Sequence, residues 1–186
     1  YHGERYDARL ERVGWNMPGY DASEWSGVKQ LEYPKDILVA QEALPPRIMD
    51  ELKPTRLFRT PAGEAVLDFG QNMVGFVRFH VKGNAGDHVV LRHAEVLDRD
   101  GNFYTANLKG AKQTIEYILK GGGEELYQPS FTFQGFRYVC IDSYPGKIEP
   151  ENFTGCVVHS QMKQSGSFAC SNELVNQLQH NIPVSY

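Results

Sequence analysis

Short runs in which apolar and polar residues alternate, separated by turns, are the feature that most restricts the fold of this chain. Between residues 74 and 81 every second side chain is apolar, and one face of the segment carries Val77, Phe79 and Val81. A period of two is typical of a strand with one buried face. Residues 82–87 combine glycine, asparagine and aspartate, which favours a turn directly after this strand.

The same pattern recurs along most of the chain and predicts an all-β fold. Val89, Leu91 and Leu97 are expected to share one buried face of the next strand, and residues 98–102 have the composition of a turn. The further strands are expected at residues 88–97, 113–119, 126–133, 136–142 and 153–161. Many short strands with frequent turns predict an antiparallel β-sandwich or jelly roll.

The two ends of the chain differ from the middle. Residues 1–36 show little alternation and are interpreted as an irregular piece of another β-domain, and Pro45-Pro46 resembles a linker. The C-terminal end predicts a helix over about 171–182, because Ser171 or Asn172 can cap it. Its apolar stripe and its expected terminator follow in the sequence as Leu174, Val175, Leu178 and then Pro183.

Size and charge narrow the class of protein. With 186 residues, of which 41% are hydrophobic and 23% charged, the chain can form one domain with a true core, plus a further piece. The net charge is −4 and no basic stripe occurs, which argues against nucleic acid as a partner. No apolar run of about 18 residues occurs, so no membrane-spanning helix is expected. The start, Tyr1-His2-Gly3, is neither a signal peptide nor an initiator methionine, and we expect a longer gene product.

The three cysteines point to packing rather than to chemistry. Their spacing matches no zinc pattern, and an odd number cannot form a complete set of disulfides. Cys140 and Cys156 lie in expected strands and are interpreted as small apolar fillers, whereas Cys170 lies further on. We therefore expect neither a metal site nor a cofactor.

The densest polar cluster is the segment 91–97. On an extended strand His93 and Glu95 point to the same side, which suits a general base pair, a metal pair, a sugar-binding pair or a hydrogen-bonded structural pair at a sheet end. We favour the structural pair, located near the rim, with the guanidinium of Arg137 as the partner of the Glu95 carboxylate. The alternative is a carbohydrate contact formed by His93, Glu95, Tyr104 and Arg137, because aromatic rings stack on sugars and polar groups bind hydroxyls.

Six segments, read in order, resemble bacterial α-L-rhamnosidases of glycoside hydrolase family 78. Gln134 is a small departure, since histidine is often expected at its position. Upstream, Tyr6–Arg9 and Asp21–Trp25 resemble the end of a preceding β-sandwich domain. The six segments are Val66–Gly75, Leu91–Asp98, Tyr104–Leu108, Phe131–Val139, Thr154–Ser160 and Ser167–Asn172.

The resemblance implies a concanavalin-like β-sandwich with a C-terminal helix. It divides the chain into the tail of an upstream β-sandwich domain at 1–36, the concanavalin-like domain at 37–165 and a linker helix at 166–186. In this family the two catalytic carboxylates lie in an (α/α)₆ barrel that follows these β-domains, so no catalytic residue, Glu95 included, is assigned to this chain. The parent reaction would be hydrolysis of terminal α-L-rhamnosides with inversion.

The implied partner is the catalytic (α/α)₆ domain of the same gene product, which this region would support or orient. A rhamnose-containing glycan is a second expected contact, and a homodimer through truncated surfaces a third. Two alternatives come from other classes of protein, an autonomous carbohydrate-binding module and a structural interaction domain without a ligand. Exposed aromatic residues on a concave face would favour the binding module, and buried ones the structural domain.

Overall fold

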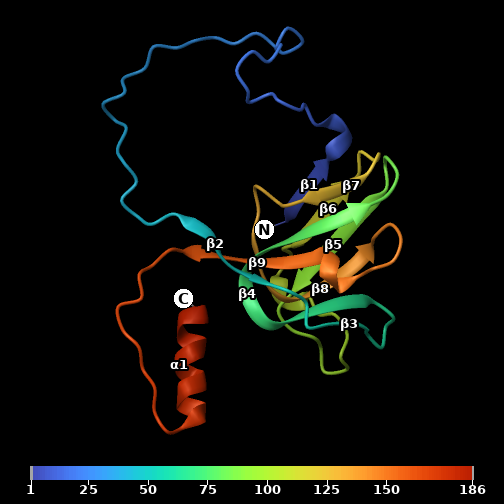
Figure 1. Ribbon diagram of the computed structural model, residues 1–186, viewed down its shortest axis with the longest axis vertical. Coiled ribbons are helices and arrows are strands. Elements are labelled where there is room, and N and C mark those ends of the chain that lie inside the picture. The colour runs from blue at the N-terminus through green and yellow to red at the C-terminus, as the bar shows by residue number, and fades with distance from the viewer. Residues whose placement is uncertain (1, 186) are drawn as a thin grey trace.

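The computed structural model describes residues 2–185 and confirms the expected β-rich architecture (Figure 1). Within this range one sheet of nine strands curls over itself into a half-barrel, and a single α-helix follows it. The strands are β1 Gly3–Asp7, β2 Pro46–Leu52, β3 Arg56–Arg59, β4 Ala65–Lys82, β5 His88–Ala94, β6 Thr114–Ile118, β7 Glu124–Tyr127, β8 Gln134–Ser143 and β9 Phe153–Ser160. The helices are α1 Glu173–Ser185 and the short 3₁₀ helices η1 Ala8–Leu10, η2 Ala106–Leu108 and η3 Pro150–Asn152.

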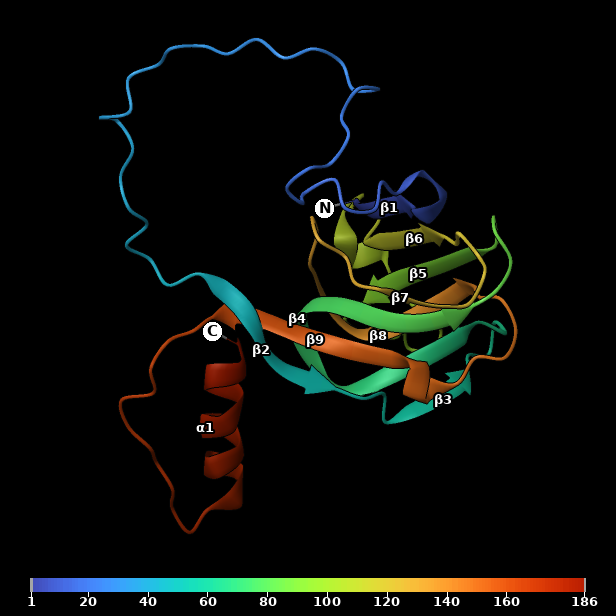
Figure 2. The same ribbon diagram turned by 45° about the horizontal axis from the view of Figure 1, so that its top comes forward.

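Strand β4 connects the two halves of the curled sheet, because its beginning and its end pair with different strands. Its first half pairs with β3 and β8, with Leu67 opposite Val139. Its second half pairs with β9 and β7, with Val77 opposite Gly155. Between the halves the pairing with β8 slips at an irregularity between Asp68 and Met73. Figure 2 shows the resulting bend, where the ribbon of β4 turns back over itself.

The strand order through the sheet is β1-β6-β5-β8-β4-β9-β2, with β3 and β7 added along β4. The pairing of β1 with β6 is parallel, and the remaining pairs are antiparallel. Strand β1 therefore closes one edge of the sheet, although it is more than a hundred residues from β6 in the sequence. The expected division of the chain at 1–36, 37–165 and 166–186 stays a prediction.

The main core fills the inside of the curl. The alternation expected for β4 is confirmed, since Val77, Phe79 and Val81 are buried while Arg78 and His80 are not. The buried residues of β5, β6 and β8 that pack beside them are Val89, Leu91, Ile115, Tyr117, Phe136, Val139 and Ile141. The cysteine interpretation is also confirmed, because Cys140 and Cys156 are free and buried, whereas Cys170 is exposed.

Leu97 does not share the face of Val89 and Leu91, so that expectation was wrong. Strand β5 ends at Ala94, and the chain bends at Glu95, which interrupts the alternation. Leu97 instead packs in a second, smaller cluster outside the main core, beside Val66, Tyr138 and Cys140.

The strand expected at 126–133 is also shorter than predicted. Strand β7 ends at Tyr127, and the aromatic side chains of Phe131 and Phe133 beyond it are exposed. Aromatic and apolar composition alone had suggested a strand here, but these residues form an irregular connection to β8.

Helix α1 confirms the expected C-terminal helix, and the Oδ1 atom of Asn172 caps it by accepting the backbone N–H of Leu174 at 3.0 Å. Pro183 was expected to end the helix, which is wrong because the helix continues to Ser185. Pro183 lacks the N–H that would bond to the preceding turn, but it lies in the last turn of α1, where only two further residues of the helix follow. Among the residues described, no helix has the length and apolar character needed to cross a membrane.

The apolar stripe of α1 does not pack on the sandwich. Leu174, Val175 and Leu178 are all exposed, and Figure 1 shows the helix standing apart from the sheet. Residues 11–45 likewise form a long irregular excursion between η1 and β2, with almost every side chain exposed. Both segments therefore leave apolar surface uncovered within the described chain.

The bend of β4 leads to a stability prediction at Gly75. This residue pairs with Gln134 on one side and Val157 on the other, and a Cβ atom there would lie 1.9 Å from the carbonyl oxygen of Cys156. We expect Gly75→Ala to lower the free energy of unfolding by about 3 kcal/mol, because backbone must move to admit the methyl group. Urea unfolding measures the change.

Gly123→Ala is the matched control, since nothing lies within 4 Å of a Cβ atom at Gly123. Its free energy of unfolding should stay within about 0.5 kcal/mol of the wild type. Equal stability of the Gly75 and Gly123 variants would contradict the close approach of the three strands.

Candidate functional site

The bend of β4 carries an ionic cluster centred on the buried carboxylate of Asp68. The guanidinium of Arg137, on β8, donates to it through Nε at 2.8 Å and Nη2 at 3.1 Å. Arg56, on β3, adds a contact at 3.3 Å, and the backbone N–H of Gly70 donates at 2.8 Å. Three segments that are distant in the sequence therefore meet at a single carboxylate.

The electrostatics of this cluster keep both partners charged. Burial would raise the pKa of Asp68, but the hydrogen bonds from Arg137 and Gly70 outweigh it and hold this pKa below its usual value. The bond with Asp68 in turn raises the pKa of Arg137. The cluster is a bidentate pair suited to fixing geometry, and it leaves Asp68 unsuited to proton transfer near neutral pH.

Arg137 was expected to pair with Glu95, and that expectation was wrong. Its guanidinium is bound to Asp68 and lies 5.0 Å from the ring centre of Tyr138. Arg137 is therefore held in place by neighbours within the sandwich. No local sequence pattern indicates this role of Asp68, because its partner lies 69 residues away.

His93 is fully buried in β5 rather than placed at the rim. Its Nδ1 atom lies 2.8 Å from the carbonyl oxygen of Gln113, and the backbone N–H of His93 donates to the same oxygen at 3.1 Å. A carbonyl only accepts, so Nδ1 carries the proton. Burial lowers the pKa of His93 to about 4, and the imidazole is neutral near pH 7.

The bond to Gln113 fixes the end of the long connection 95–113. Gln113 has a φ of 46°, which is unusual for a residue with a side chain, and the two bonds from His93 hold its carbonyl in place. The ring of Phe136 packs against the imidazole edge-on, with ring centres 4.9 Å apart. Within the described residues Nε2 of His93 has no hydrogen-bond partner.

Glu95 is the first residue after β5, and the chain bends there. Its Oε1 atom accepts a hydrogen bond from Nδ2 of Asn72 at 3.3 Å. A Cβ atom at Gly135 would lie 3.4 Å from the same oxygen, so Glu95 covers the start of β8. The expected position at the end of a strand is confirmed, whereas its partner differs from the one expected.

Tyr104 lies in the connection 95–113 and is exposed. The carboxylate of Glu64 accepts the N–H of Phe103 at 3.2 Å, and Oδ1 of Asn102 accepts the N–H of Ala62 at 2.9 Å, which anchors this part of the connection. The four residues expected to contact sugar have different surroundings. His93 is buried, whereas Glu95 and Tyr104 reach the surface. The guanidinium of Arg137 is bound to Asp68, but its side chain is 37% exposed.

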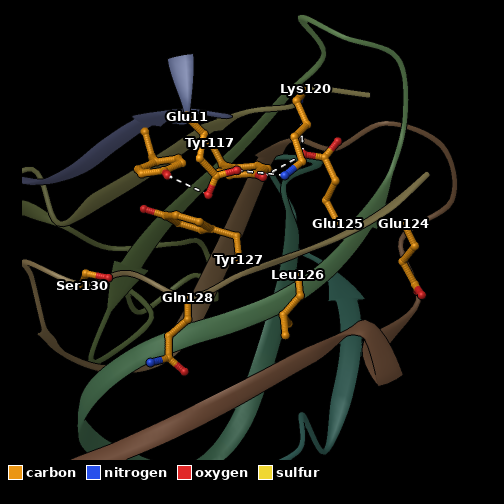
Figure 3. Close-up of a pocket in the computed structure, with 10 residues that line it drawn as sticks. Glu11, Tyr117, Lys120, Glu124, Glu125, Leu126, Tyr127, Gln128 and Ser130 are labelled. Carbon is orange, nitrogen blue, oxygen red and sulfur yellow. Dashed lines mark hydrogen bonds and ion pairs between the residues drawn. The ribbon is translucent and has the colours of Figure 1, made fainter. Parts of the chain in front are cut away.

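A second polar site, which the sequence did not indicate, lies where β1 and η1 meet β6 and β7. Figure 3 shows its lining side chains, which surround a cavity of about 350 Å³. Three tyrosines form its wall. The rings of Tyr6 and Tyr117 are stacked with centres 5.9 Å apart, and those of Tyr117 and Tyr127 are 4.4 Å apart.

Three carboxylates in or beside this tyrosine pocket are held by hydrogen bonds or an ion pair. Glu125 is buried and accepts hydrogen bonds from Tyr117 at 2.8 Å and from the N–H groups of Lys120 at 3.1 Å and Gly121 at 2.8 Å. Glu11 forms an ion pair with the ammonium group of Lys120 at 2.8 Å. The hydroxyl of Tyr127 donates to Glu4, which also accepts the N–H of Phe131 at 2.7 Å.

These contacts indicate that the pocket holds the N-terminal segment of the chain against the sheet. Burial raises the pKa of Tyr117 and of Tyr127, and hydrogen bonds to Glu125 and Glu4 raise them further, so both hydroxyls stay protonated. The chain between residues 4 and 11 is thereby tied to β6 and β7. The part of the chain that the structure describes contains no group of three or more side chains arranged to hold a metal ion.

Comparison with known proteins identifies two family models along the chain. Residues 58–159 match the bacterial alpha-L-rhamnosidase concanavalin-like domain, and residues 1–50 match the alpha-L-rhamnosidase N-terminal domain. An alpha-L-rhamnosidase of Streptomyces avermitilis is 47% identical over 97% of this chain and 18% of its own length. One from an Alteromonas species is 37% identical over 98% of this chain and 20% of its own length.

Solved structures agree with these matches. The alpha-L-rhamnosidase of Aspergillus terreus aligns with a TM-score of 0.92 and 41% identity, over 100% of this chain and 22% of that one. The enzyme from Dictyoglumus thermophilum aligns with a TM-score of 0.90 and 42% identity, over 99% of this chain and 21% of that one. The chain thus spans about a fifth of the length of the relatives that it matches.

The Asp68 cluster generates a prediction about stability. We expect Asp68→Asn to lower the free energy of unfolding by about 2 kcal/mol, because it leaves Arg137 without its charged partner at a partly solvated position. Denaturant unfolding measures this loss. Asp36→Asn, at an exposed position in the irregular segment 11–45, is the control and should change little. Indistinguishable losses in the two variants would refute the structural role of Asp68.

His93 generates a prediction about pH. Because its pKa falls from 6.5 to about 4 on folding, the unfolded chain binds a proton between these pH values that the folded chain does not. Stability should therefore decrease as the pH falls through this range, with His93 contributing up to ~1.4 kcal/mol per pH unit.

In His93→Gln this contribution is absent, so the stability difference between wild type and variant should shrink between pH 6.5 and pH 4.5. Unfolding by urea at several pH values gives the slopes. His180→Gln, on the exposed surface of α1, should keep the wild-type slope. A wild-type slope in the His93 variant would rule out a buried, neutral imidazole.

Proposed function

The chain belongs to the bacterial α-L-rhamnosidase family through its concanavalin-like domain, and from this premise we propose its role. It is a non-catalytic β-sandwich region of a longer α-L-rhamnosidase that hydrolyses terminal α-L-rhamnosides with inversion. Its task is to support and orient the catalytic (α/α)₆ domain of the same gene product. The observation that carries the proposal is the match of the whole chain to only 22% of a solved α-L-rhamnosidase.

The chemistry of the described residues supports a non-catalytic role. Inverting hydrolysis of a glycoside needs two carboxyl groups about 6.5–9.5 Å apart, one to donate a proton and one to activate water. The buried carboxylates of Asp68 and Glu125 are each held by several hydrogen bonds. Both oxygens of each carboxylate have hydrogen-bond partners, so neither carboxylate is free to donate a proton or to activate a water molecule.

Rigid construction supports the proposed orienting role. The bend of β4 is fixed by Asp68 and Arg137, and the first residues of the chain are fixed by the tyrosine pocket. A sandwich held at both places can transmit a defined orientation to a domain attached to it. The proposed division of the chain is a tail of an upstream domain at 1–36, a sandwich at 37–165 and a linker at 166–186.

A glycan contact and a homodimer are the two further parts of the proposal. Of the four residues expected to contact sugar, Glu95, Tyr104 and Arg137 reach the surface and would be the contacts of a rhamnose-containing glycan. A homodimer would bury the exposed stripe of α1, namely Leu174, Val175 and Leu178. Size-exclusion chromatography with light scattering reports the dimer directly.

The activity prediction compares this chain with the longer gene product. We expect no hydrolysis of an aryl α-L-rhamnoside by the 186-residue chain, and rapid hydrolysis by the product that also contains the barrel. Release of the aryl group measures both. Turnover by the chain alone that disappeared in Glu95→Gln would place catalysis in the sandwich and defeat the proposal.

Calorimetry with rhamnose on wild type and Glu95→Gln tests the glycan contact separately.

A further inference from the structure

We propose that Val74, Phe131 and Phe133 form a docking surface for the catalytic domain of the longer rhamnosidase chain. We name these three residues the rim patch, and the inference rests on the proposed function. Their exposed fractions are 49%, 94% and 67%, although all three are large apolar side chains in or beside the sheet. Contiguous exposed apolar surface of this kind marks an interaction site.

Strand pairing places Val74 close to Phe133. Val74, on β4, lies opposite Gly135, on β8, and Gly75 lies opposite Gln134. Phe133 is the residue directly before Gln134, and Phe131 precedes it by two residues in the connection between β7 and β8.

The backbone beneath the rings is fixed, so their exposure is a stable feature. The carboxylate of Glu4 accepts the N–H groups of Ser130 at 3.2 Å and Phe131 at 2.7 Å. Gln134 begins β8 and pairs with Gly75. Side chains presented on an ordered backbone lose little entropy on binding, and such aromatic anchors supply much of the affinity of an interface.

A polar edge borders the patch. The hydrogen bond between Asn72 and Glu95 lies beside Gly135, since Oε1 of Glu95 is 3.4 Å from the Cβ position of that glycine. An apolar centre with polar groups at its margin is the usual composition of a protein interface. The patch therefore suits an apolar protein surface with hydrogen-bonding groups around it.

The course of the chain identifies the occupant. Val157, on β9, pairs with Gly75, the neighbour of Val74, and β9 ends three residues later at Ser160. Figures 1 and 2 show the β7–β8 connection on the same side of the sandwich as the exit from β9. The chain thus leaves the sandwich beside the rim patch on its way to α1.

The lengths of the relatives add a second argument. The chain spans 18% and 20% of two α-L-rhamnosidases, so in such proteins a large further region belongs to the same polypeptide. A domain joined through α1 would be tethered to the sandwich at the exit of β9, and a covalent tether raises its effective concentration near the rim patch. This favours the catalytic domain over a separate protein as the occupant.

The test uses the full-length enzyme and the double substitution Phe131→Ser/Phe133→Ser. We expect the half-life of rhamnosidase activity near the melting temperature to shorten by about tenfold, which corresponds to ~1.4 kcal/mol of lost contact. The same substitutions in the 186-residue chain should leave its melting temperature unchanged, because both rings are exposed there. Leu126→Ser is the control. Leu126 is also an exposed apolar residue, at 57%, but it lies on β7 opposite His80, six residues along β4 from Val74.

Three outcomes would overturn the inference. The first is that the double variant of the full-length enzyme is active and keeps the wild-type half-life. The second is that the substitutions lower the melting temperature of the 186-residue chain. The third is that the 186-residue chain forms a homodimer and the substitutions abolish it. Full-length protein without rhamnosidase activity would instead refute the proposed function. In that case the unfolding rate of the full-length double variant, followed by fluorescence, still tests the patch, and it should exceed the wild-type rate by the same factor.

Discussion

The passage of β4 from one layer to the other is the constraint on which the rest of the structure depends. A strand can serve both layers only if it bends sharply without losing its partners, and three features allow this. Asp68 pairs with Arg137 across the bend, Gly70 adopts a φ of 77° beside it, and Gly75 admits the backbone of β9 where a methyl group would collide. The buried aromatic core and the neighbouring strands assemble around this bend.

Long-range polar contacts complete the sandwich at its edge. Glu4 and Glu125 bind tyrosine hydroxyls and backbone N–H groups, and they join the first strand to β6, β7 and the start of the connection to β8. Burying a carboxylate is costly unless its oxygens are hydrogen-bonded, and the oxygens of the buried Glu125 and the partly buried Glu4 are hydrogen-bonded. The same saturation explains why a pocket rich in acids and tyrosines provides structure rather than acid–base chemistry.

The distribution of exposed apolar surface agrees with the proposed supporting role. Inside the sandwich the carboxylates of Asp68 and Glu125 are hydrogen-bonded, although Nε2 of His93 has no partner among the described residues. Large apolar side chains at the margins are not covered, and many of them lie in the irregular segment 11–45, along α1 and at the rim patch of Val74, Phe131 and Phe133. Exposed apolar surface of this kind is available for contact with neighbouring parts of a longer chain.

The sequence by itself determined the β-rich class, the burial of Val77, Phe79 and Val81, the C-terminal helix and the family, because these follow from local periodicity and from motifs read in order. Only the tertiary structure decided that Asp68 is the partner of Arg137, that His93 is buried and bound to Gln113, and that the tyrosine pocket exists. Alternation predicts the face of a side chain only while a strand continues, and β5 ends one residue before Glu95. Pairing between residues 69 or 123 positions apart depends on how the sheet curls, which no local pattern records.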